Sequence, residues 1–511
     1  MSGEALKNVR SDAQPRISTL KIFLVVVVAI TALLAIVTPA NRGPDEPMHT
    51  DLVLKAAELT ISNPMTETLS PAVVSSLNKS KGVLSTSLEA EEAQPRKERL
   101  SYLALGGVQD DTTQANGISQ HPPLYYFYSA AVREVVLLTM PDPIPWDQDL
   151  LLIRLTNIPL LVATILLCVG AIRRSNTRSE VSLLLILFLP QFLWLHAIVN
   201  NDNMLIATAA GFVYLLSDFS RRHSRRWVAF LGLSVGLALL SKAFAIALVA
   251  VGSVVVFSYA RGLRRRVENL LIFNVVAFVV GGWWYAWRYL EYGTFIPKQS
   301  LLKNKNPVED LDLLYFIRRF VLQMTQSFVG KFGWLDVRTS WPYSAAVLLI
   351  TMALLAIGLR LVLKSHRLRR DDRQFFPVLF MLWLVQVAIA FDFALGAHIN
   401  SGLFPAIQGR YLLPTVSALI VMLSIVLGQK YSPQWRLLYL ALPIPWIISL
   451  EAMFDAWYEP ERDSISISGV FRNLAAWSPV EPAWVLSLLL VSGISMGMLM
   501  KRGITNGWDD D

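Results

Sequence analysis

Two adjacent carboxylates, Asp45 and Glu46, directly follow an apolar stretch that is long enough to cross a lipid bilayer. Neighbouring acids raise each other's pKa, and together they can accept a proton or hold a divalent cation such as Mg²⁺ or Mn²⁺. The pair therefore predicts base or metal chemistry on a substrate that arrives from the lipid, with both acids in a loop beside water. The alternative is a turn made by Pro44 and Pro47, in which the acids only solvate the chain.

Two histidines could join this chemistry. His49 follows the acidic pair closely, and His121 lies in the segment Gln120-His-Pro-Pro-Leu-Tyr125. Imidazole binds divalent metals, so both could ligate a cation held by the two acids. Their spacing fits no fixed metal-binding motif, and a role in substrate binding is the other possibility.

Two cations fall between apolar stretches and could bind a phosphate group. Lys242 lies in a very short connection, where a lone cation near the membrane is costly unless it meets an anion. Arg410 follows Gly409 at the start of a span, where a planar guanidinium can bind a phosphate at two points. Each has an alternative: Lys242 could reach a lipid phosphate, and Arg410 could be an interfacial anchor paired with a carboxylate.

Polar and aromatic groups near these cations complete the set of candidates. Asn201 and Asp202 follow an apolar stretch and could bind substrate, although a helix cap in a polar hairpin explains them equally well. Tyr125 and Trp334 belong to a set of aromatic residues that could stack on sugar rings. An aromatic belt at the membrane surface explains most of that set without a ligand.

The composition places these groups in a membrane. The 511-residue chain is 54% hydrophobic and 16% charged, with a mean hydropathy of +0.46, which indicates an all-α polytopic integral membrane protein. The net charge of +8 does not indicate nucleic-acid binding, because the basic residues occur in short runs between apolar spans. No nucleic-acid partner is expected.

Scanning for apolar runs predicts about twelve transmembrane helices. Every cluster of Lys and Arg between them falls on the same side as the N-terminus, which the positive-inside rule makes cytoplasmic. We therefore expect a multi-pass protein of the cell (inner or plasma) membrane with both termini in the cytoplasm. The predicted spans are 20–38, 151–172, 181–199, 203–219, 227–241, 243–260, 269–290, 343–363, 375–392, 410–428, 437–457 and 483–500.

The long connections all lie on the opposite, extracytoplasmic face. Residues 1–19 form a cytoplasmic tail, residues 40–150 a first outer loop and residues 291–342 a second. Residues 431–511 hold the last transmembrane helices and a cytoplasmic tail. Within the first loop, 124–139 is predicted as a helix lying in the membrane interface, because Arg133 and Glu134 are too costly for a span. The polar segment 60–120 is expected to be mobile or only partly ordered.

Five short motifs on the outer face resemble a known family. They are Pro44-Asp45-Glu46-Pro47-x-His49, His121-Pro-Pro-Leu-Tyr125, Val199-Asn-Asn-Asp202, Phe332-Gly-Trp334 and Gln408-Gly-Arg-Tyr-Leu-Leu-Pro414. Their order resembles the bacterial membrane family of domain of unknown function 2142. The acidic pair after the first span, the long first outer loop and the dozen spans resemble the GT-C superfamily of membrane glycosyltransferases. The likeness covers residues 20–430.

GT-C enzymes take a sugar from a polyprenyl-phosphate carrier and transfer it to an acceptor on the outer face. The resemblance implies that 20–430 is the catalytic module, with Asp45 as the base or acceptor-orienting carboxylate and Glu46 as its partner or a ligand of Mg²⁺ or Mn²⁺. Arg410 and Lys242 would bind the departing phosphate. The implied substrate-binding residues are His49, His121, Tyr125, Asn201, Asp202, Trp334, Gln408 and Tyr411.

The acceptor implied by the resemblance is a glycan or lipid of the cell envelope. The chain inserts Pro47-Met48 between the acids and His49, and it has no recognisable soluble sugar-binding domain, so a protein acceptor is disfavoured. A transporter or flippase of lipid-linked glycans is one alternative, which would favour charges within the spans and inverted repeats. A glycan polymerase or ligase is another, which would not require an acidic pair after the first span.

Overall fold

The computed structural model describes residues 18–59, 63–84, 86–108, 112–140, 143–175, 178–218, 224–297, 307–364, 368–429, 437–459 and 467–505. Helices form nearly all the regular structure of these residues. The one β-sheet within them is a hairpin of β1 (Lys331–Phe332) and β2 (Val337–Arg338). The tail predicted for residues 1–19 lies outside the described residues except for its last two positions.

Eight segments of the described chain are long and apolar enough to cross a membrane, and each coincides with a predicted span. The chain is therefore a multi-pass helical membrane protein. The segments are α1 (Thr19–Val37), α5 (Trp146–Leu155) with α6 (Asn157–Arg173), α11 (Leu263–Ala277) with η6 (Phe278–Gly282) and α12 (Trp283–Tyr292), α14 (Trp341–Lys364), α15 (Arg370–Ser401), η7 (Gly409–Thr415) with α16 (Val416–Gln429), α17 (Leu437–Leu440) with α18 (Pro443–Trp457), and α20 (Pro482–Thr505).

The other four predicted spans are helical but shorter. The stretch 181–199 is divided into η3 (Glu180–Ile186) and α7 (Pro190–His196). Pro190 lacks a backbone N–H and can only begin a helix, which explains the break. The remaining three correspond to α8 (Asp202–Leu216), α9 (Arg225–Leu239) and α10 (Ile246–Ser258). The count of twelve stays a prediction.

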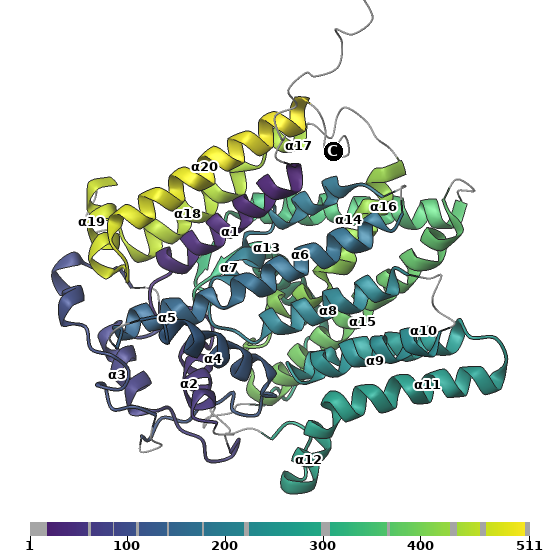
Figure 1. Ribbon diagram of the computed structural model, residues 1–511, viewed down its shortest axis with the longest axis horizontal. Helices are drawn as coiled ribbons and strands as arrows, with labels where there is room; N and C mark the ends of the chain where they lie inside the picture. Colours follow the sequence, from purple (N-terminus) through teal and green to yellow (C-terminus); the bar gives the residue numbers. More distant parts are fainter. Residues whose placement is uncertain are drawn as a thin grey trace, which may run out of the picture.

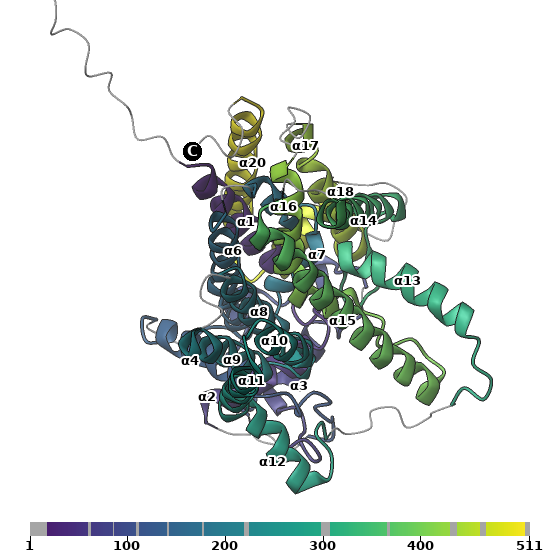
Figure 2. The ribbon, with the colours of Figure 1, turned by 90° about the vertical axis from the view of Figure 1, so that its right-hand side faces the viewer.

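Two groups of helices form the body of the protein (Figures 1 and 2). α1 and α20 pack along each other although they lie at opposite ends of the chain, and a row of α6, α8, α9 and α11 crosses the molecule. The backbones of α9 and α11–η6 touch at glycines: a Cβ on Gly281 would lie 2.0 Å from the carbonyl oxygen of Gly236. Together with Gly232, this makes a Gly-x-x-x-Gly face that fixes α9, at whose end Lys242 follows.

The first outer loop folds as a layer at one end of the helices (Figure 1). It contains α2 (Glu46–Ala57), α3 (Pro71–Lys79), the 3₁₀ turns η1 (Ala90–Glu92) and η2 (Arg96–Glu98), and α4 (Leu124–Leu137). Lys55 of α2 is fully buried and pairs with Asp51 (3.1 Å) and with Glu67. Asp51 also accepts the backbone N–H of Ser70 (2.8 Å) and the amide of Asn116 (3.0 Å). The described parts of 60–120 are therefore folded around α2, which corrects the expectation of a mobile segment.

The helix predicted at 124–139 is present as α4, whereas its position in the membrane interface stays a prediction. Arg133 forms a two-point ion pair with Asp149 of α5 (2.6 and 2.5 Å). At the other end, the backbone N–H of Leu124 donates to the carbonyl of Leu240, two residues before Lys242. α4 thus ties the outer layer to the end of α9.

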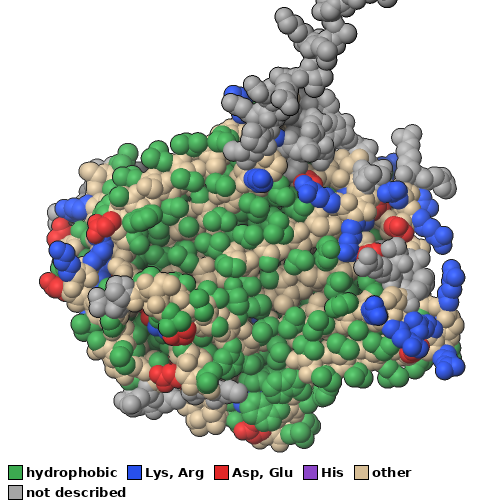
Figure 3. Space-filling model, in the orientation of Figure 1, with side chains coloured by type: hydrophobic (Ala, Val, Ile, Leu, Met, Phe, Trp, Pro, Cys, Tyr) green, Lys and Arg blue, Asp and Glu red, His purple; other side chains and the backbone are tan. Residues whose placement is uncertain are grey.

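The surface has the charge pattern expected of a membrane protein. Figure 3 shows hydrophobic side chains across the middle of the molecule and Lys and Arg gathered along its right-hand edge, where α10 turns into α11. The opposite edge carries charges of both signs around the outer layer. This distribution agrees with the sidedness predicted from the sequence, and the cytoplasmic position of the termini stays a prediction.

Cysteine labelling tests the predicted sidedness. Leu103 in the first outer loop is 80% exposed and Leu263 at the start of α11 is 70% exposed. In a Cys168→Ala background, we expect a membrane-impermeant maleimide added to intact spheroplasts to label Leu103→Cys, and to label Leu263→Cys only after permeabilisation. Labelling of Leu263→Cys in intact spheroplasts would reverse the assignment.

Candidate active site

Arg154 holds the chain segment between α1 and α2 in place. Its five N–H donors bind the carbonyls of Ala35 and Thr38 (both 2.7 Å), the carbonyl of Pro39 (2.9 Å) and both carboxylate oxygens of Glu46 (2.8 and 2.7 Å). The carbonyls at a helix C-terminus have no partner within the helix, so one guanidinium both caps α1 and binds Glu46. We call this arrangement the Arg154 clamp.

Glu46 is the central group of this clamp, and its environment corrects one expectation. Its side chain is fully buried rather than in a loop beside water. Besides Arg154, it accepts the backbone N–H groups of Gly43 (3.1 Å) and Val199 (3.1 Å). Both of its oxygens are therefore used within the protein. This geometry suits a positioning role better than the predicted catalytic one.

Asp45 turns away from this clamp because its backbone is left-handed. Its φ is 61° and its ψ is 9°, a conformation that costs free energy in a residue with a side chain and that often occurs at functional sites. Its Oδ2 accepts a hydrogen bond from Nη2 of Arg410 at 2.7 Å. The Asp45 side chain is 26% exposed, whereas that of Glu46 is fully buried, so Asp45 is the acid that a substrate can reach.

A second ion pair lies beside the first. Nζ of Lys242 donates to Oδ1 of Asp202 at 2.7 Å, and the other Asp202 oxygen lies 3.9 Å from Nε of Arg410. Asp202 is 1% exposed. Two cations and two carboxylates, brought from four distant parts of the chain, thus form one neutral cluster. We call these four residues the ionic centre.

The motif Val199-Asn-Asn-Asp202 builds the support for Lys242. The side-chain oxygen of Asn200 accepts the backbone N–H of Asp202 (2.9 Å) at the start of α8. The amide of Asn201 donates to the carbonyl of Ser241 (3.0 Å), next to Lys242. Asn201 therefore joins the connection before α8 to the connection after α9. Its side-chain oxygen, Oδ1, is buried without a hydrogen-bond partner. Asn201 is the N-cap residue of α8, as predicted, but its side chain makes no cap hydrogen bond, while Asp202 faces the two cations.

The two predicted histidines lie together near the ionic centre. The rings of His49 and His121 stack with centroids 6.2 Å apart, and Nδ1 of His49 is 2.9 Å from the hydroxyl of Tyr126. His49 is buried, and its pKa is lowered well below its usual value by that burial and by the charges of Lys242 and Arg410. His49 is neutral at pH 7 and can accept or donate a hydrogen bond.

Tyr411 and Tyr125 have different surroundings. Tyr411 lies beside the ionic centre, since the cations of Lys242 and Arg410 are each 5.5 Å from the centroid of its ring. Phe244 stacks on the same ring at 4.7 Å. Tyr125 is fully buried and its hydroxyl contacts Asn157 (3.1 Å) and the backbone N–H of Asn200 (3.1 Å), which is a packing role.

Two further predicted residues, Gln408 and Trp334, make no side-chain hydrogen bond to the ionic centre within the described chain. Gln408 donates to the carbonyl of Pro405 (2.9 Å), and its oxygen is buried without a hydrogen-bond partner next to Gly409 and Arg410. Trp334 lies in the turn between β1 and β2. Within the described chain it has no hydrogen bond or ring contact to the centre, so the geometry does not place it beside Asp45.

The donor atoms do not fit a metal ion shared by Asp45 and Glu46. Each acid already binds its own arginine, and Glu46 has no free oxygen. Among the described residues, no three His, Cys, Asp or Glu side chains come together in a metal-binding group. The predicted metal role of these acids has no geometric support and stays a prediction.

The sequence contains one signal for the importance of Arg154. Arg154 is the single charged residue in an apolar run that extends from Leu150 to Ile172, and a charge in such a run needs a buried partner. That the partner is Glu46 depends on how α5 lies against the end of α1.

The clamp makes a prediction about stability. Glu46→Gln removes one member of a buried, two-point ion pair, so we expect a loss of about 3–5 kcal/mol in the free energy of unfolding. Asp45→Asn leaves the clamp intact and should unfold close to wild type. Thermal unfolding of both purified variants in one detergent provides the comparison. Equal midpoints for the two variants would contradict the clamp.

The lowered pKa of His49 predicts how the stability of the protein depends on pH. The unfolded chain protonates His49 near its ordinary pKa of about 6.5, while the folded protein resists protonation, so stability falls as pH drops below about 6.5. His49→Gln keeps a polar partner for Tyr126 and removes the titration. We expect the unfolding midpoint of wild type to fall more steeply than that of His49→Gln between about pH 6.5 and 5. Parallel curves would refute the assignment.

Comparison with known proteins gives a family match and distant structural likenesses. A family model described as "Predicted membrane protein (DUF2142)" matches residues 28–442. The structure of ArnT from Cupriavidus metallidurans bound to undecaprenyl phosphate has 16% identity and a TM-score of 0.49, over 96% of this chain and 74% of that one. Archaeoglobus fulgidus oligosaccharyltransferase AglB with an inhibitory peptide and a dolichol-phosphate has 12% identity and a TM-score of 0.36, over 95% and 56%. Both scores are low and carry no weight in assigning an activity. No curated protein matches the chain.

Proposed function

Because the chain belongs to the DUF2142 family of predicted membrane proteins, we propose that its ionic centre transfers a sugar from a polyprenyl-phosphate carrier to a glycan or lipid of the cell envelope. The observation that carries the proposal is the partly exposed Asp45 carboxylate, held 2.7 Å from Arg410 and backed by the Lys242–Asp202 pair. A base and two cations at one place are what sugar transfer from a phosphate requires.

Asp45 is the proposed base. In the reaction, an acceptor hydroxyl attacks the anomeric carbon of the donor sugar, a new carbon–oxygen bond forms and the bond from that carbon to the phosphate oxygen breaks. The hydroxyl proton passes to Asp45, and the electron pair of the broken bond leaves with polyprenyl phosphate. Attack opposite the leaving group inverts the anomeric carbon. Asp45 is the only exposed acid of the ionic centre, which is why the proton is assigned to it.

Arg410 and Lys242 are proposed to bind the phosphate. Both cations are at present paired with carboxylates, so an arriving phosphate competes with Asp45 for Arg410. Exchange of that partner would leave Asp45 free to accept a proton when the donor is bound. Asp202 has one oxygen on Lys242 and the other facing Arg410, so it keeps both cations in place during the exchange.

His49, His121 and Tyr411 are proposed to line the space for the sugar. Neutral imidazoles can donate and accept hydrogen bonds with hydroxyl groups without adding charge. The ring of Tyr411, stacked on Phe244, closes the side next to the cations. In this proposal Glu46 orients the loop, and Asp45 accepts the proton without Mg²⁺ or Mn²⁺.

Asp45→Asn tests the role of the base. The variant keeps the shape of the side chain and loses its charge, so we expect the rate to fall by about 10² to 10⁴. The readout is release of undecaprenyl phosphate from undecaprenyl-phosphate-linked glucose, mannose, galactose and N-acetylglucosamine in purified protein with envelope glycans as acceptors. Asp455→Asn, the same change at an exposed position of α18, is the control.

The outcomes of this experiment separate the candidate functions. Release by wild type and Asp455→Asn but not by Asp45→Asn supports transfer with Asp45 as base. Unchanged release by Asp45→Asn removes the main support for the proposal. Movement of the intact donors across liposome membranes without release would favour the transporter alternative.

Arg410→Lys tests the phosphate site. Lysine keeps the charge but loses the planar fork, so it cannot bind a phosphate at two points as arginine can. We expect release of undecaprenyl phosphate to fall by at least about tenfold, about 1.4 kcal/mol, with little change in the unfolding midpoint. Arg472→Lys, at an exposed position of α19 (Ile467–Trp477), is the matched control. Wild-type kinetics in Arg410→Lys would exclude Arg410 from the site.

A further inference from the structure

The β1–β2 hairpin brings two cations together on the side that faces away from the core. Lys331 and Arg338 are directly opposite each other, and Phe332 and Val337 form the next pair. Successive residues of a strand face opposite sides, and Phe332 (0% exposed) and Val337 (3%) pack in the core. Lys331, which is half-buried, and Arg338, which is exposed, therefore share the other face. The proposed function uses no residue of this hairpin.

The backbone hydrogen bonds show that the two cations are a closely spaced pair. The N–H of Thr339 donates to the carbonyl of Gly330 (3.1 Å), whereas the N–H of Lys331 donates away from the hairpin, to the side-chain oxygen of Gln191 (2.8 Å). Lys331 and Arg338 are thus a non-hydrogen-bonded pair, in which Cα atoms lie about 4.5 Å apart and side chains are closest. Like charges directly opposite each other destabilise a hairpin.

No carboxylate neutralises this pair. Within the described chain, the side chains of Lys331 and Arg338 form no ion pair and no hydrogen bond. Asp336, at the turn, acts on Lys331 and also on the fully buried Arg42, so its single charge is shared between them. The pKa of Lys331 is lowered, first by partial burial and then by the charge of Arg338. The hairpin therefore carries uncompensated positive charge.

The flanking helices place this charge at the membrane surface. Arg338 lies three residues before Trp341, which begins the apolar span α14 and is 41% exposed. Before the hairpin, α13 (Leu313–Val329) ends two residues from Lys331 and exposes apolar side chains, with Leu314 79% and Val321 51% exposed. Figure 2 shows α13 at the edge of the molecule. Cations beside a lipid-facing helix and the start of a span lie at the level of the lipid phosphates.

The hairpin and the ionic centre are on the same side of the protein. The backbone N–H of Gly409, next to Arg410, donates to the hydroxyl of Ser327 near the end of α13 (2.7 Å). On the predicted sidedness, the hairpin therefore meets the outer leaflet. It shares no residue with the ionic centre, so an anion can bind at each place.

The chemistry of the hairpin selects the ligand. Phosphate oxygens can accept hydrogen bonds from Lys331 and Arg338 at once, which removes the repulsion between the two cations. The excess of positive charge favours a net anionic lipid over a zwitterionic one. A phosphate monoester carries close to two negative charges and is repelled by Asp336 more strongly than a phosphodiester, which carries one. A glycerol headgroup adds hydroxyls that can donate to the Asp336 carboxylate.

We propose that the β1–β2 hairpin binds the phosphodiester headgroup of an anionic phospholipid, with Lys331 and Arg338 on the phosphate and the acyl chains along the apolar face of α13. The inference does not rest on the proposed function, because neither cation belongs to the ionic centre. A lipid bound there ties the end of α13 to the membrane surface. Through Ser327, it also steadies the backbone next to Arg410.

Native mass spectrometry of the purified, delipidated full-length protein tests the proposal. The probes are dioleoyl-phosphatidylglycerol, which is anionic, and the dioleoyl forms of phosphatidylcholine and phosphatidylethanolamine, which are zwitterionic. We expect phosphatidylglycerol to bind more tightly than either. The double variant Lys331→Gln/Arg338→Gln should weaken its binding by about 10- to 30-fold, from about fivefold for each cation.

Two further double variants serve as controls. Lys97→Gln/Arg472→Gln removes the same charge from exposed positions of the outer layer and should bind phosphatidylglycerol like wild type. Lys331→Arg/Arg338→Lys keeps both charges on the hairpin and should bind more tightly than the double glutamine variant at the same positions.

Thermal unfolding makes the test independent of folding. In detergent without anionic lipid, Lys331→Gln/Arg338→Gln should unfold at the wild-type midpoint or above it, because the repulsion between like charges is gone. Added phosphatidylglycerol should raise the midpoint of wild type more than that of this variant. A lower midpoint for the variant without lipid would show that the cations are satisfied within the protein, which contradicts the proposal.

Four binding results would overturn the proposal. The first is equal affinity for phosphatidylglycerol and a zwitterionic lipid, and the second is equal binding by Lys331→Gln/Arg338→Gln and Lys97→Gln/Arg472→Gln. Tighter binding of undecaprenyl phosphate through the same two residues would assign the hairpin to the carrier lipid. Displacement of phosphatidylglycerol by an equal concentration of inorganic phosphate would assign it to a soluble anion.

Discussion

The buried ion pair between Arg154 and Glu46 is the interaction on which the rest of the outer face depends. A guanidinium among apolar helices is tolerated only when every donor is satisfied, and Arg154 satisfies its donors with the last carbonyls of α1 and with Glu46. The same contact fixes where α1 ends and where α2 begins. Asp45 is the last residue of the loop between them, and its backbone is left-handed.

This arrangement divides two neighbouring carboxylates between structure and chemistry. Glu46 is enclosed and both of its oxygens are bound, so moving it would leave the charge of Arg154 buried without its partner. Asp45 is partly exposed and bound to Arg410, a partner that a phosphate can displace. Of these two adjacent acidic residues, one is therefore fixed and the other can change its partner. This division suits a reaction in which an anion binds first and a base is then needed.

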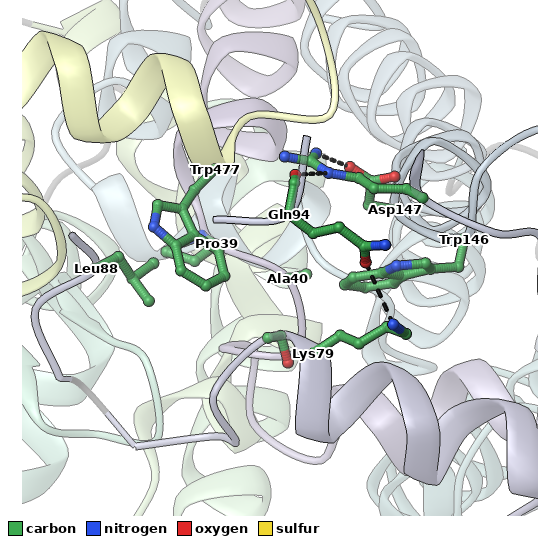
Figure 4. Close-up of a pocket in the computed structure, with 10 residues that line it drawn as sticks. Pro39, Ala40, Lys79, Leu88, Gln94, Trp146, Asp147 and Trp477 are labelled. Carbon is green, nitrogen blue, oxygen red and sulfur yellow. Dashed lines mark hydrogen bonds and ion pairs between the residues drawn. The ribbon is translucent and has the colours of Figure 1, made fainter. Parts of the chain in front are cut away.

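Buried ion pairs also hold the outer layer together. Lys55, Asp51 and Glu67 form a buried ionic cluster that ties the first loop to α2, while Asn41 bonds to Ser80 at the end of α3 (3.0 Å). A pocket lined by Trp146 and Trp477 lies where this layer meets the C-terminal helices (Figure 4). A segment of the chain with a polar composition is folded here because charged groups bury one another.

Local composition and spacing determined the class of the protein, the approximate positions of its spans and the outer-face motifs. These follow from the sequence because every helix that crosses a bilayer needs about the same apolar length, and because clusters of Lys and Arg stay on the cytoplasmic side. Most of the predicted polar residues do meet, including Asp45, Asp202, Lys242 and Arg410. Only the tertiary structure decided their roles. Glu46 and Tyr125 are buried, and Arg154 forms the clamp, because the choice of partner depends on how distant helices pack. No local pattern of residues encodes that packing.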